Sequence, residues 1–414
     1  MKTFGFILGF LAATTAPILA QSPSDPRLAE ALKILERDNA WTLEQQTSIC
    51  EIPAPPFKEA ARGAEYTRRL QALGYQATID QIGNVIAVRK GVGGGRRLVL
   101  AAHLDTVFPE GTDVRVRHQG ARLSGPGIGD DCRGLAVVLA VARAVQLARV
   151  ETAGDLVFVG NVGEEGPGNL RGIRHLFETQ PAGAIEAFIS VDGIGLGVVS
   201  RGVGSNRYRV IFKGPGGHSY GDFGMPNPMH AMGRAIAMIA DLQVPTTPRT
   251  IFNVGIVEGG TSVNSIAGTA TMQVDLRSES AAALASVDSA FQRAVTTAVE
   301  RERARWPESK AALDVEVQVI GKRAAGSQPD SAWIVRAALE TARQLGIPAP
   351  KPGTASTDAN VPMGLGVPAL ALDGGGRGDG AHSLGEWYQD GDRGFLGPQW
   401  ALLLAVRVAG QKGR

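Results

Sequence analysis

The sequence predicts an α/β protein, with a mixed, mostly parallel sheet covered by helices on both faces and a smaller α+β domain inserted into it. Two observations support this class. Short, almost uninterrupted apolar runs alternate with helical patterns up to about residue 200 and again after about residue 325, as is typical of strands buried on both faces. Between residues 203 and 324, strand-like segments alternate polar and apolar residues, which indicates a sheet with one solvated face.

The first part of the main domain, which we place at residues 24–202, is expected to begin with helices. A proline-rich break at 53–56 separates two helical regions, and the second is expected to run from Phe57 to Gly74, because glycine commonly ends a helix. Apolar runs then predict four buried strands, with a long apolar helix between the second and the third. The strands are expected at 85–88, 98–103, 156–162 and 187–191, and the helix at 135–150.

The inserted domain, at residues 203–324, has a β-α-β-β-α-β order that is typical of a split βαβ sandwich. Its expected elements are a strand at 208–212, a helix at 228–242, strands at 251–257 and 270–276, a helix at 281–305 and a strand at 313–319. The main domain resumes over residues 325–414, with a helix at 331–345 and a buried strand at 367–372.

The first twenty residues have the layout of a signal peptide. Lys2 precedes the apolar run Phe4–Leu11, and small residues lead to Ala20, after which cleavage is expected. The alternatives are a short membrane anchor or a buried helix, but the run is short for a bilayer, which needs about 20 residues. We therefore expect a periplasmic or secreted protein.

Composition excludes several classes of partner. A length of 414 residues favours two domains or one domain with an insertion. Lys and Arg number 42 against 40 Asp and Glu, and this balance gives no electrostatic reason to expect nucleic acid or a membrane surface as a partner. Cys50 and Cys132 are too few for a disulfide framework, and the sequence leaves open whether they pair.

Potential metal ligands follow the predicted strands. The carboxyl ends of parallel strands meet at one edge of a sheet, so side chains placed there can converge. His103 and Asp105 lie on one side of an extended backbone, and the glycine loop 125–129 leads into two aspartates. The candidates are His103, Asp105, Asp130, Asp131, Glu164, Glu165, Asp192 and His382.

Each of these segments has an ordinary interpretation when taken alone. A His-x-Asp pair is more often a satisfied buried histidine than a ligand, and adjacent glutamates usually mark a solvated turn. Glu164 and Glu165, however, directly follow a buried apolar run, where two unpaired carboxylates would be very costly. A divalent cation removes that cost, and the imidazole and carboxylate ligands suit zinc, with cobalt or manganese as possible substitutes.

Five of these segments, in this order, resemble the motifs of the M20 metallopeptidases. They are His103-Leu104-Asp105-Thr106-Val107, the glycine loop ending at Asp130-Asp131, Gly163-Glu164-Glu165-Gly166, Val191-Asp192 and the late His382. The resemblance extends into the inserted domain, at residues 216–218 and 259–264. The family includes aminopeptidases, carboxypeptidases, dipeptidases and N-acyl-amino-acid deacylases.

The resemblance implies two zinc ions per chain. Asp130 would bridge them, His103 and Asp192 would complete one site, and Glu165 and His382 the other. Glu164 would be the general base, and Asp105 would orient His103.

One departure from the family pattern concerns the bridging aspartate. Counting from the upstream glycines selects Asp130, whereas counting back from Gly134 selects Asp131. We prefer Asp130, because the glycine loop determines how the chain approaches the site. The resemblance also implies a cis peptide bond between Asp130 and Asp131.

The inserted domain resembles the dimerisation or lid domain of this family. The resemblance implies that His218 reaches the active site of a neighbouring subunit, and that Asn264 and Arg277 contact the carboxylate or the backbone of the substrate. Arg277 has an alternative, a surface ion pair with Asp275 or Glu279.

The sequence therefore predicts a secreted, homodimeric dizinc peptidase, exopeptidase-like, acting on small peptides. The alternative is an N-acyl-amino-acid deacylase or related amidohydrolase, which needs the same metals. An alternative of another class is a non-catalytic binding protein that keeps the fold, but such relatives usually lose a ligand or the base, and this sequence keeps them all.

Overall fold

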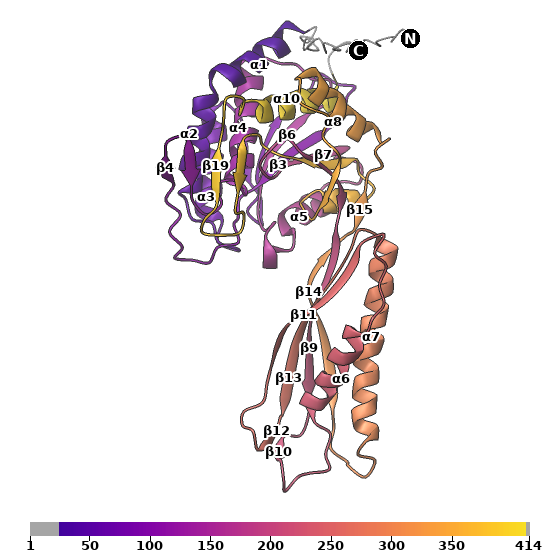
Figure 1. Cartoon of the computed structure of the whole chain (residues 1–414). Coiled ribbons are helices and arrows are strands. Elements are labelled where there is room, and N and C mark those ends of the chain that lie inside the picture. The colour runs from indigo at the N-terminus through magenta and orange to yellow at the C-terminus, as the bar shows by residue number, and fades with distance from the viewer. Residues whose placement is uncertain (1–24, 411–414) are drawn as a thin grey trace, which may run out of the picture.

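The described part of the protein consists of a rounded lobe, built from its first and last segments, and an elongated lobe built from the segment between them (Figure 1). The computed structural model describes residues 25–410, so the expected signal peptide at residues 1–20 lies outside the described residues.

The rounded lobe is built around a mixed sheet with the strand order β1-β2-β6-β3-β7-β17-β8-β15, and β16 pairs with β8. Its four central strands, β6, β3, β7 and β17, are parallel, and the strands outside them are mostly antiparallel. The predicted fold class is thereby confirmed. The strands are β1 (Ala77–Ile79), β2 (Val85–Arg89), β3 (Leu98–His103), β6 (Leu156–Asn161), β7 (Ala187–Val191), β8 (Val198–Gly202), β15 (Gly326–Ser327), β16 (Gly353–Ala355) and β17 (Ala369–Leu372).

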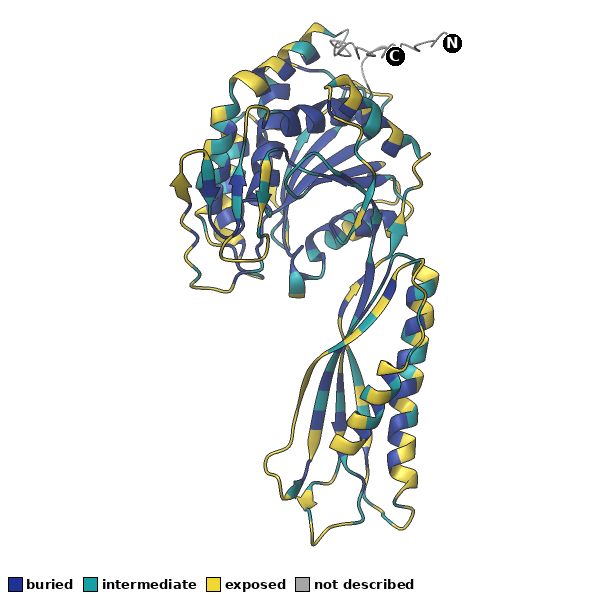
Figure 2. Cartoon of the chain, in the orientation of Figure 1, coloured by how far each residue is buried: buried dark blue, intermediate teal, exposed yellow. Residues whose placement is uncertain are grey.

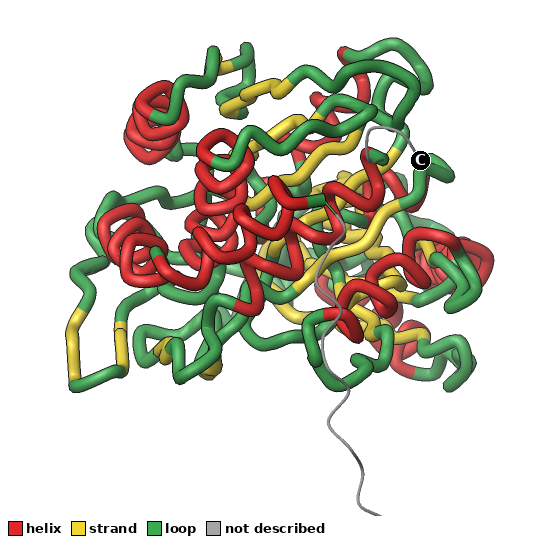
Figure 3. The backbone as a smooth tube through the Cα atoms, turned by 90° about the horizontal axis from the view of Figure 1, so that it is seen from above, coloured by secondary structure: helices red, strands yellow, loops and turns green. Residues whose placement is uncertain are grey.

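Helices cover both faces of this sheet, which is why its four central strands are buried (Figures 2 and 3). Alternate residues of β3 enter different cores: Leu98 and Leu100 pack with the helices of one face, and Val99 and Ala101 with those of the other. One face carries α1 (Pro26–Arg37), α4 (Cys132–Leu147), α8 (Trp333–Gln344) and α10 (Leu396–Ala409), and the other α5 (Arg171–Thr179) and α9 (Asn360–Gly364).

The helix boundaries differ from those expected. The N-terminal region forms three helices, α1, α2 (Asn39–Cys50) and α3 (Ala60–Ala72). The last does not begin at Phe57, because Phe57 has a left-handed backbone with φ of 66°. α4 begins at Cys132, before the expected Leu135, because the Asp131 side chain caps it by accepting from the Gly134 N–H at 3.0 Å.

A small sheet that the sequence analysis missed connects distant parts of the chain. Its strand order is β18-β19-β5-β4, and Trp387 of β19 pairs with Ser124 of β5. β5 leads directly into the glycine loop, and β18 leads into the loop that carries His382, so this sheet brings the two loops side by side. The strands are β4 (Arg117–Gln119), β5 (Arg122–Ser124), β18 (Arg377–Asp379) and β19 (Trp387–Gln389).

The elongated lobe is a four-stranded antiparallel sheet, of order β11-β13-β9-β14, with two helices packed on it and a core of its own. A pair of very short strands lies at its far tip (Figure 1). Its elements are β9 (Gly204–Lys213), β10 (Gly217–His218), α6 (Pro228–Ala240), β11 (Thr250–Gly259), β12 (Ser265–Ile266), β13 (Thr269–Ser278), α7 (Ala281–Ala304) and β14 (Asp314–Arg323). Within residues 25–410, no helix combines the length and the apolarity that crossing a bilayer requires.

Candidate metal centre

The five side chains predicted as metal ligands meet at one edge of the large sheet. His103 is the last residue of β3, Glu165 lies in the loop after β6, and Asp192 directly follows β7. Asp130 comes from the glycine loop, and His382 from the loop between β18 and β19. The parallel strands and the small sheet together therefore account for the convergence.

Asp130 lies between the two histidines. Its Oδ1 is 3.0 Å from Nε2 of His103, and its Oδ2 is 3.1 Å from Nε2 of His382, which is also 3.0 Å from Oε1 of Glu165. Three groups of three potential ligands result, each with its ligand atoms within 4.8 Å of one another. They are His103 with Asp130 and Asp192, Asp130 with Glu165 and His382, and His103 with Glu164 and Glu165. The first two groups share Asp130, whose two carboxylate oxygens could each serve one of them.

The charges of the centre fit bound cations. Burial, and then the charge of Asp130, raise the pKa of both Glu165 and Asp192 to about 7. Burial also acts to raise the pKa of Asp130, but hydrogen bonds with His103 and His382 hold it below its ordinary value. The hydrogen bond with Asp130 in turn raises the pKa of His382 to about 9. Such crowded carboxylates are stabilised by positive charge, and two imidazoles with three carboxylates form a donor set suited to zinc.

Asp131 does not face this group. The peptide bond between Asp130 and Asp131 is cis. The buried Asp131 carboxylate accepts from the backbone N–H groups of His103 and Gly134, both at 3.0 Å. It therefore ties the end of β3 to the start of α4. Counting from the upstream glycines selects the aspartate that points at both histidines.

Asp105 orients the centre in a different way from the one expected. Nδ1 of His103 is 3.0 Å from the backbone oxygen of Asp105 and 3.7 Å from its carboxylate. The carboxylate instead accepts from the backbone N–H groups of Glu164, at 3.0 Å, and Glu165, at 2.8 Å. One residue thus positions His103 through its carbonyl and both glutamates through its side chain.

Glu164, the expected base, lies buried beside the ligands and forms an ion pair that the sequence analysis missed. Nη1 of Arg323 is 3.0 Å from Oε1 of Glu164, and Nη2 donates to the Glu164 backbone oxygen. Burial raises the pKa of Glu164, and the Arg323 charge opposes that shift. Arg323 is the last residue of β14, so this contact links the two lobes. A single arginine outside any motif gave no signal.

Glu386 is a second residue that the sequence analysis missed. Its fully buried carboxylate accepts from the backbone N–H groups of Gly127, at 2.8 Å, Gly129, at 2.7 Å, and Asp130, at 2.9 Å. It therefore holds the loop that presents Asp130. A single acidic residue before a three-residue strand is common in protein sequences, so the sequence does not indicate this role for Glu386.

The three residues expected to contact substrate do not join this centre within the chain. His218 and Asn264 are exposed at the far tip of the elongated lobe, where the Ser219 N–H donates to the Asn264 backbone oxygen at 2.9 Å (Figure 1). Arg277 lies on β13, and its Nε donates to Asp275 at 2.7 Å. The surface ion pair considered as an alternative is therefore the contact that Arg277 makes.

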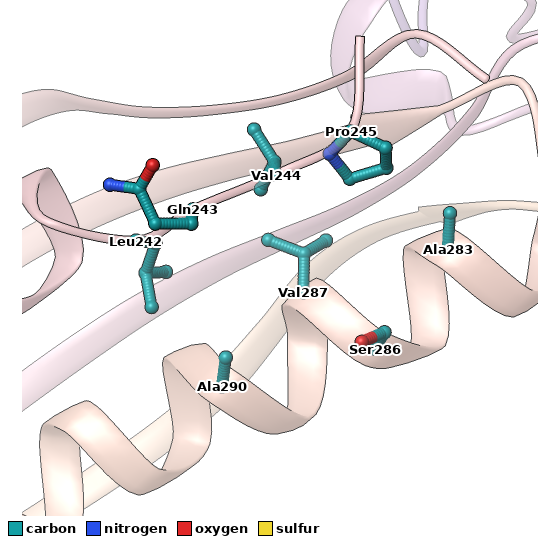
Figure 4. A pocket seen from close by; sticks show the side chains of 8 residues that line it. All are labelled: Leu242, Gln243, Val244, Pro245, Ala283, Ser286, Val287 and Ala290. Carbon is teal, nitrogen blue, oxygen red and sulfur yellow. The ribbon is translucent and has the colours of Figure 1, made fainter. Parts of the chain in front are cut away.

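A small apolar cavity of about 150 Å³ lies elsewhere in the elongated lobe, between residues 242–245 and α7 (Figure 4). Leu242, Val244 and Pro245 face Val287 across it, and no histidine, cysteine or acidic side chain lines it. It therefore offers no group for metal binding or proton transfer.

Comparison with known proteins gives one family and several relatives. The family model described as peptidase family M20/M25/M40 matches residues 99–394. A putative LysW-lysine/LysW-ornithine hydrolase from Pyrococcus abyssi is 36% identical over 118 residues, which are 28% of this chain and 32% of that protein. Carboxypeptidase G2 from a Pseudomonas species is 30% identical over 131 residues, 30% of this chain and 32% of that protein. Each match therefore spans about a third of the curated relative.

Solved structures share the fold over most of the chain. The aminopeptidase PepT from Bacillus cereus has a TM-score of 0.70 at 20% identity, covering 89% of this chain and 98% of that one. A Staphylococcus aureus tripeptidase has a TM-score of 0.71 at 18% identity, covering 89% and 97%. A Bacillus subtilis protein described as a dinuclear metal-binding peptidase from the M20 family has a TM-score of 0.64 at 18% identity, covering 90% and 99%.

The hydrogen bonds of Glu386 lead to a prediction. Glu386→Gln replaces a carboxylate that accepts three backbone N–H groups with an amide that has one acceptor oxygen and an NH₂ group facing donors. We expect metal affinity to fall by about 10- to 100-fold, as when other residues that position ligands are changed. Calorimetric titration of the metal-depleted protein with Zn²⁺ measures this. Asp392→Asn, at an exposed carboxylate, is the control, and equal affinities for the two variants would contradict the role given to Glu386.

Proposed function

Because this chain belongs to peptidase family M20/M25/M40, we propose that it is a metal-dependent hydrolase that cleaves small peptides in the manner of an exopeptidase, with two zinc ions per chain. The observation that carries the proposal is the pair of ligand groups that share Asp130. Cobalt or manganese are the expected substitutes for zinc, because the same nitrogen and oxygen donors suit them.

Two divalent cations, when bound at such a centre, lower the pKa of a water and polarise the scissile carbonyl. His103, Asp130 and Asp192 would hold one cation, and Asp130, Glu165 and His382 the other. Glu164 takes a proton from the water while the water oxygen bonds to the scissile carbonyl carbon. Glu164 then gives that proton to the amine nitrogen as the carbon–nitrogen bond breaks. Asp105 keeps Glu164 and Glu165 in place through their backbone N–H groups.

The same centre can hydrolyse other amides, so the second candidate is an N-acyl-amino-acid deacylase or related amidohydrolase. Its support is the diversity of the relatives, which include a carboxypeptidase and a putative LysW-lysine hydrolase. Rates on matched free dipeptides and N-acyl amino acids separate the two candidates. A non-catalytic binding protein is disfavoured, because every expected ligand and the expected base are retained.

We also propose that the protein is a homodimer in which the tip of each elongated lobe reaches the metal centre of the partner. His218 and Asn264 lie at the far end of that lobe from their own centre (Figure 1). β11 supports the proposal, because it is a ten-residue edge strand that exposes Ile256 and Val257, and an exposed edge is open to pairing with another chain.

Export of the protein is part of the proposal, and its support is the signal-like pattern of residues 1–20. We expect the exported protein to begin at Gln21, because cleavage is expected after Ala20. Intact-mass measurement of the periplasmic or secreted fraction tests this, and retention of Met1 would instead indicate an anchor or an unexported enzyme.

The roles given to the two adjacent glutamates lead to opposite phenotypes. Glu164→Gln should lower kcat by about 100- to 10,000-fold with two zinc ions still bound, because the amide cannot take the proton although it still offers an oxygen to Arg323. Glu165→Gln should lower metal affinity, because a ligand is lost. Metal content by mass spectrometry and kcat on a dipeptide are the measurements.

Two outcomes would contradict this assignment. Reversed phenotypes would mean that base and ligand are interchanged. Unchanged turnover by protein from which all metal has been removed would overturn the metal-dependent mechanism itself.

The proposed dimer predicts that inactive subunits complement one another. The Glu164→Gln subunit lacks the base of its own site, and the His218→Ala subunit lacks the side chain that would reach the metal centre of its partner. A mixed dimer contains one site with both groups intact, so equal mixing after subunit exchange should recover about a quarter of wild-type activity. Light scattering reports the oligomeric state. Two Glu164→Gln preparations mixed together are the control, and no recovery in a mixture shown to contain mixed dimers would contradict action across the interface.

A further inference from the structure

A cavity of about 490 Å³ opens where the two lobes meet, between α5, α9 and the end of β14. α5 lies at the side of the rounded lobe from which the strands pass to the elongated lobe (Figure 1). None of the five candidate metal ligands lines this cavity. Its volume falls within the range of about 300–1,000 Å³ that is usual for pockets binding small molecules.

Most of the wall is apolar. Leu170 and Phe177 contribute from the α5 side, and Val361 and Leu365 from the α9 side. Phe177 is fixed from behind by Phe188 of β7, with ring centroids 6.2 Å apart. Leu365, by contrast, is 61% exposed, so an apolar surface at the cavity is uncovered and available to a ligand.

The charged part of the wall is predominantly positive. Arg174, Lys322 and Arg323 face one acidic residue, Glu178. The side chains of Arg174 and Lys322 have no hydrogen bond or ion pair with any residue in the range 25–410. Glu178 lies four residues after Arg174 on α5, but the two side chains form no ion pair. Two cations without partners beside an apolar wall are suited to an anion, and arginine in particular matches a carboxylate.

We propose that this cavity is a second binding site, for a small monocarboxylate with an aromatic or branched aliphatic body. The carboxylate binds between Arg174 and Lys322, and the body packs on Phe177, Val361 and Leu365. An apolar body is required because the wall is mainly apolar, and a single negative charge is required because Glu178 opposes a larger one. The site is separate from the proposed hydrolysis, although Arg323 borders it and also contacts Glu164.

The test is a calorimetric titration of the full-length, metal-loaded protein with 3-phenylpropanoate. A probe of this size should bind with a Kd on the order of 1 mM. Its neutral analogue 3-phenylpropanol and inorganic phosphate should each bind about tenfold more weakly, because one lacks the charge and the other the apolar body. Absence of saturable binding by about 10 mM, or equal binding of inorganic phosphate, would overturn the proposal.

Variants locate the binding site. Arg174→Gln with Lys322→Gln should weaken 3-phenylpropanoate by about tenfold. Arg336→Gln with Lys351→Gln removes two exposed cations elsewhere and is the matched control for net charge. Thermal unfolding confirms that both pairs are folded. If the two pairs bind the probe equally, the carboxylate lies elsewhere, for instance on the metals. Binding is measured here without hydrolysis, so this outcome is independent of the proposed function.

Discussion

The candidate metal centre depends on one repeated interaction, in which a buried carboxylate outside the two groups that share Asp130 accepts the backbone N–H of a residue that belongs to them. Asp131 holds His103, Asp105 holds Glu165, and Glu386 holds Asp130. Each of these carboxylates accepts two or three backbone hydrogen bonds. Because these hydrogen bonds act on the backbone, they determine where each candidate ligand side chain begins.

The same interaction explains why the centre is confined to one sheet edge. Each supporting carboxylate links two elements: Asp131 joins β3 to α4, Asp105 joins β3 to the loop after β6, and Glu386 joins the small sheet to the glycine loop. These carboxylates are buried, so removal of their partners would leave them without compensation. The parallel strands bring the ligands to one edge, and the supporting carboxylates fix their positions there.

Sequence reasoning succeeded where the signal was local. The apolar runs at 98–103 and 156–162 predicted buried strands, and the candidate ligands His103 and Glu165 follow from their position at or just after such strands. It failed where a role depends on pairing between distant segments. Glu386 acts through a sheet joined across more than two hundred residues, and Arg323 reaches Glu164 from the other lobe. The predicted starts of two helices were wrong for local reasons. Phe57 has a left-handed backbone, so α3 begins after it, and the Asp131 side chain caps α4, so that helix begins earlier than expected.

The small sheet β18-β19-β5-β4 also affects the order of events during biosynthesis. His382 and Glu386 are made more than two hundred and fifty residues after their partners Asp130 and Gly127. Contacts of such long sequence separation form late in folding, because the entropy of closing the loop must first be overcome. A nascent chain can hold β3 and its histidine in place early, yet it lacks His382, one of the five candidate ligands, and Glu386, which holds Asp130, until the segment that carries them has docked. The group of Asp130, Glu165 and His382 is therefore completed only when that segment docks on the rounded lobe.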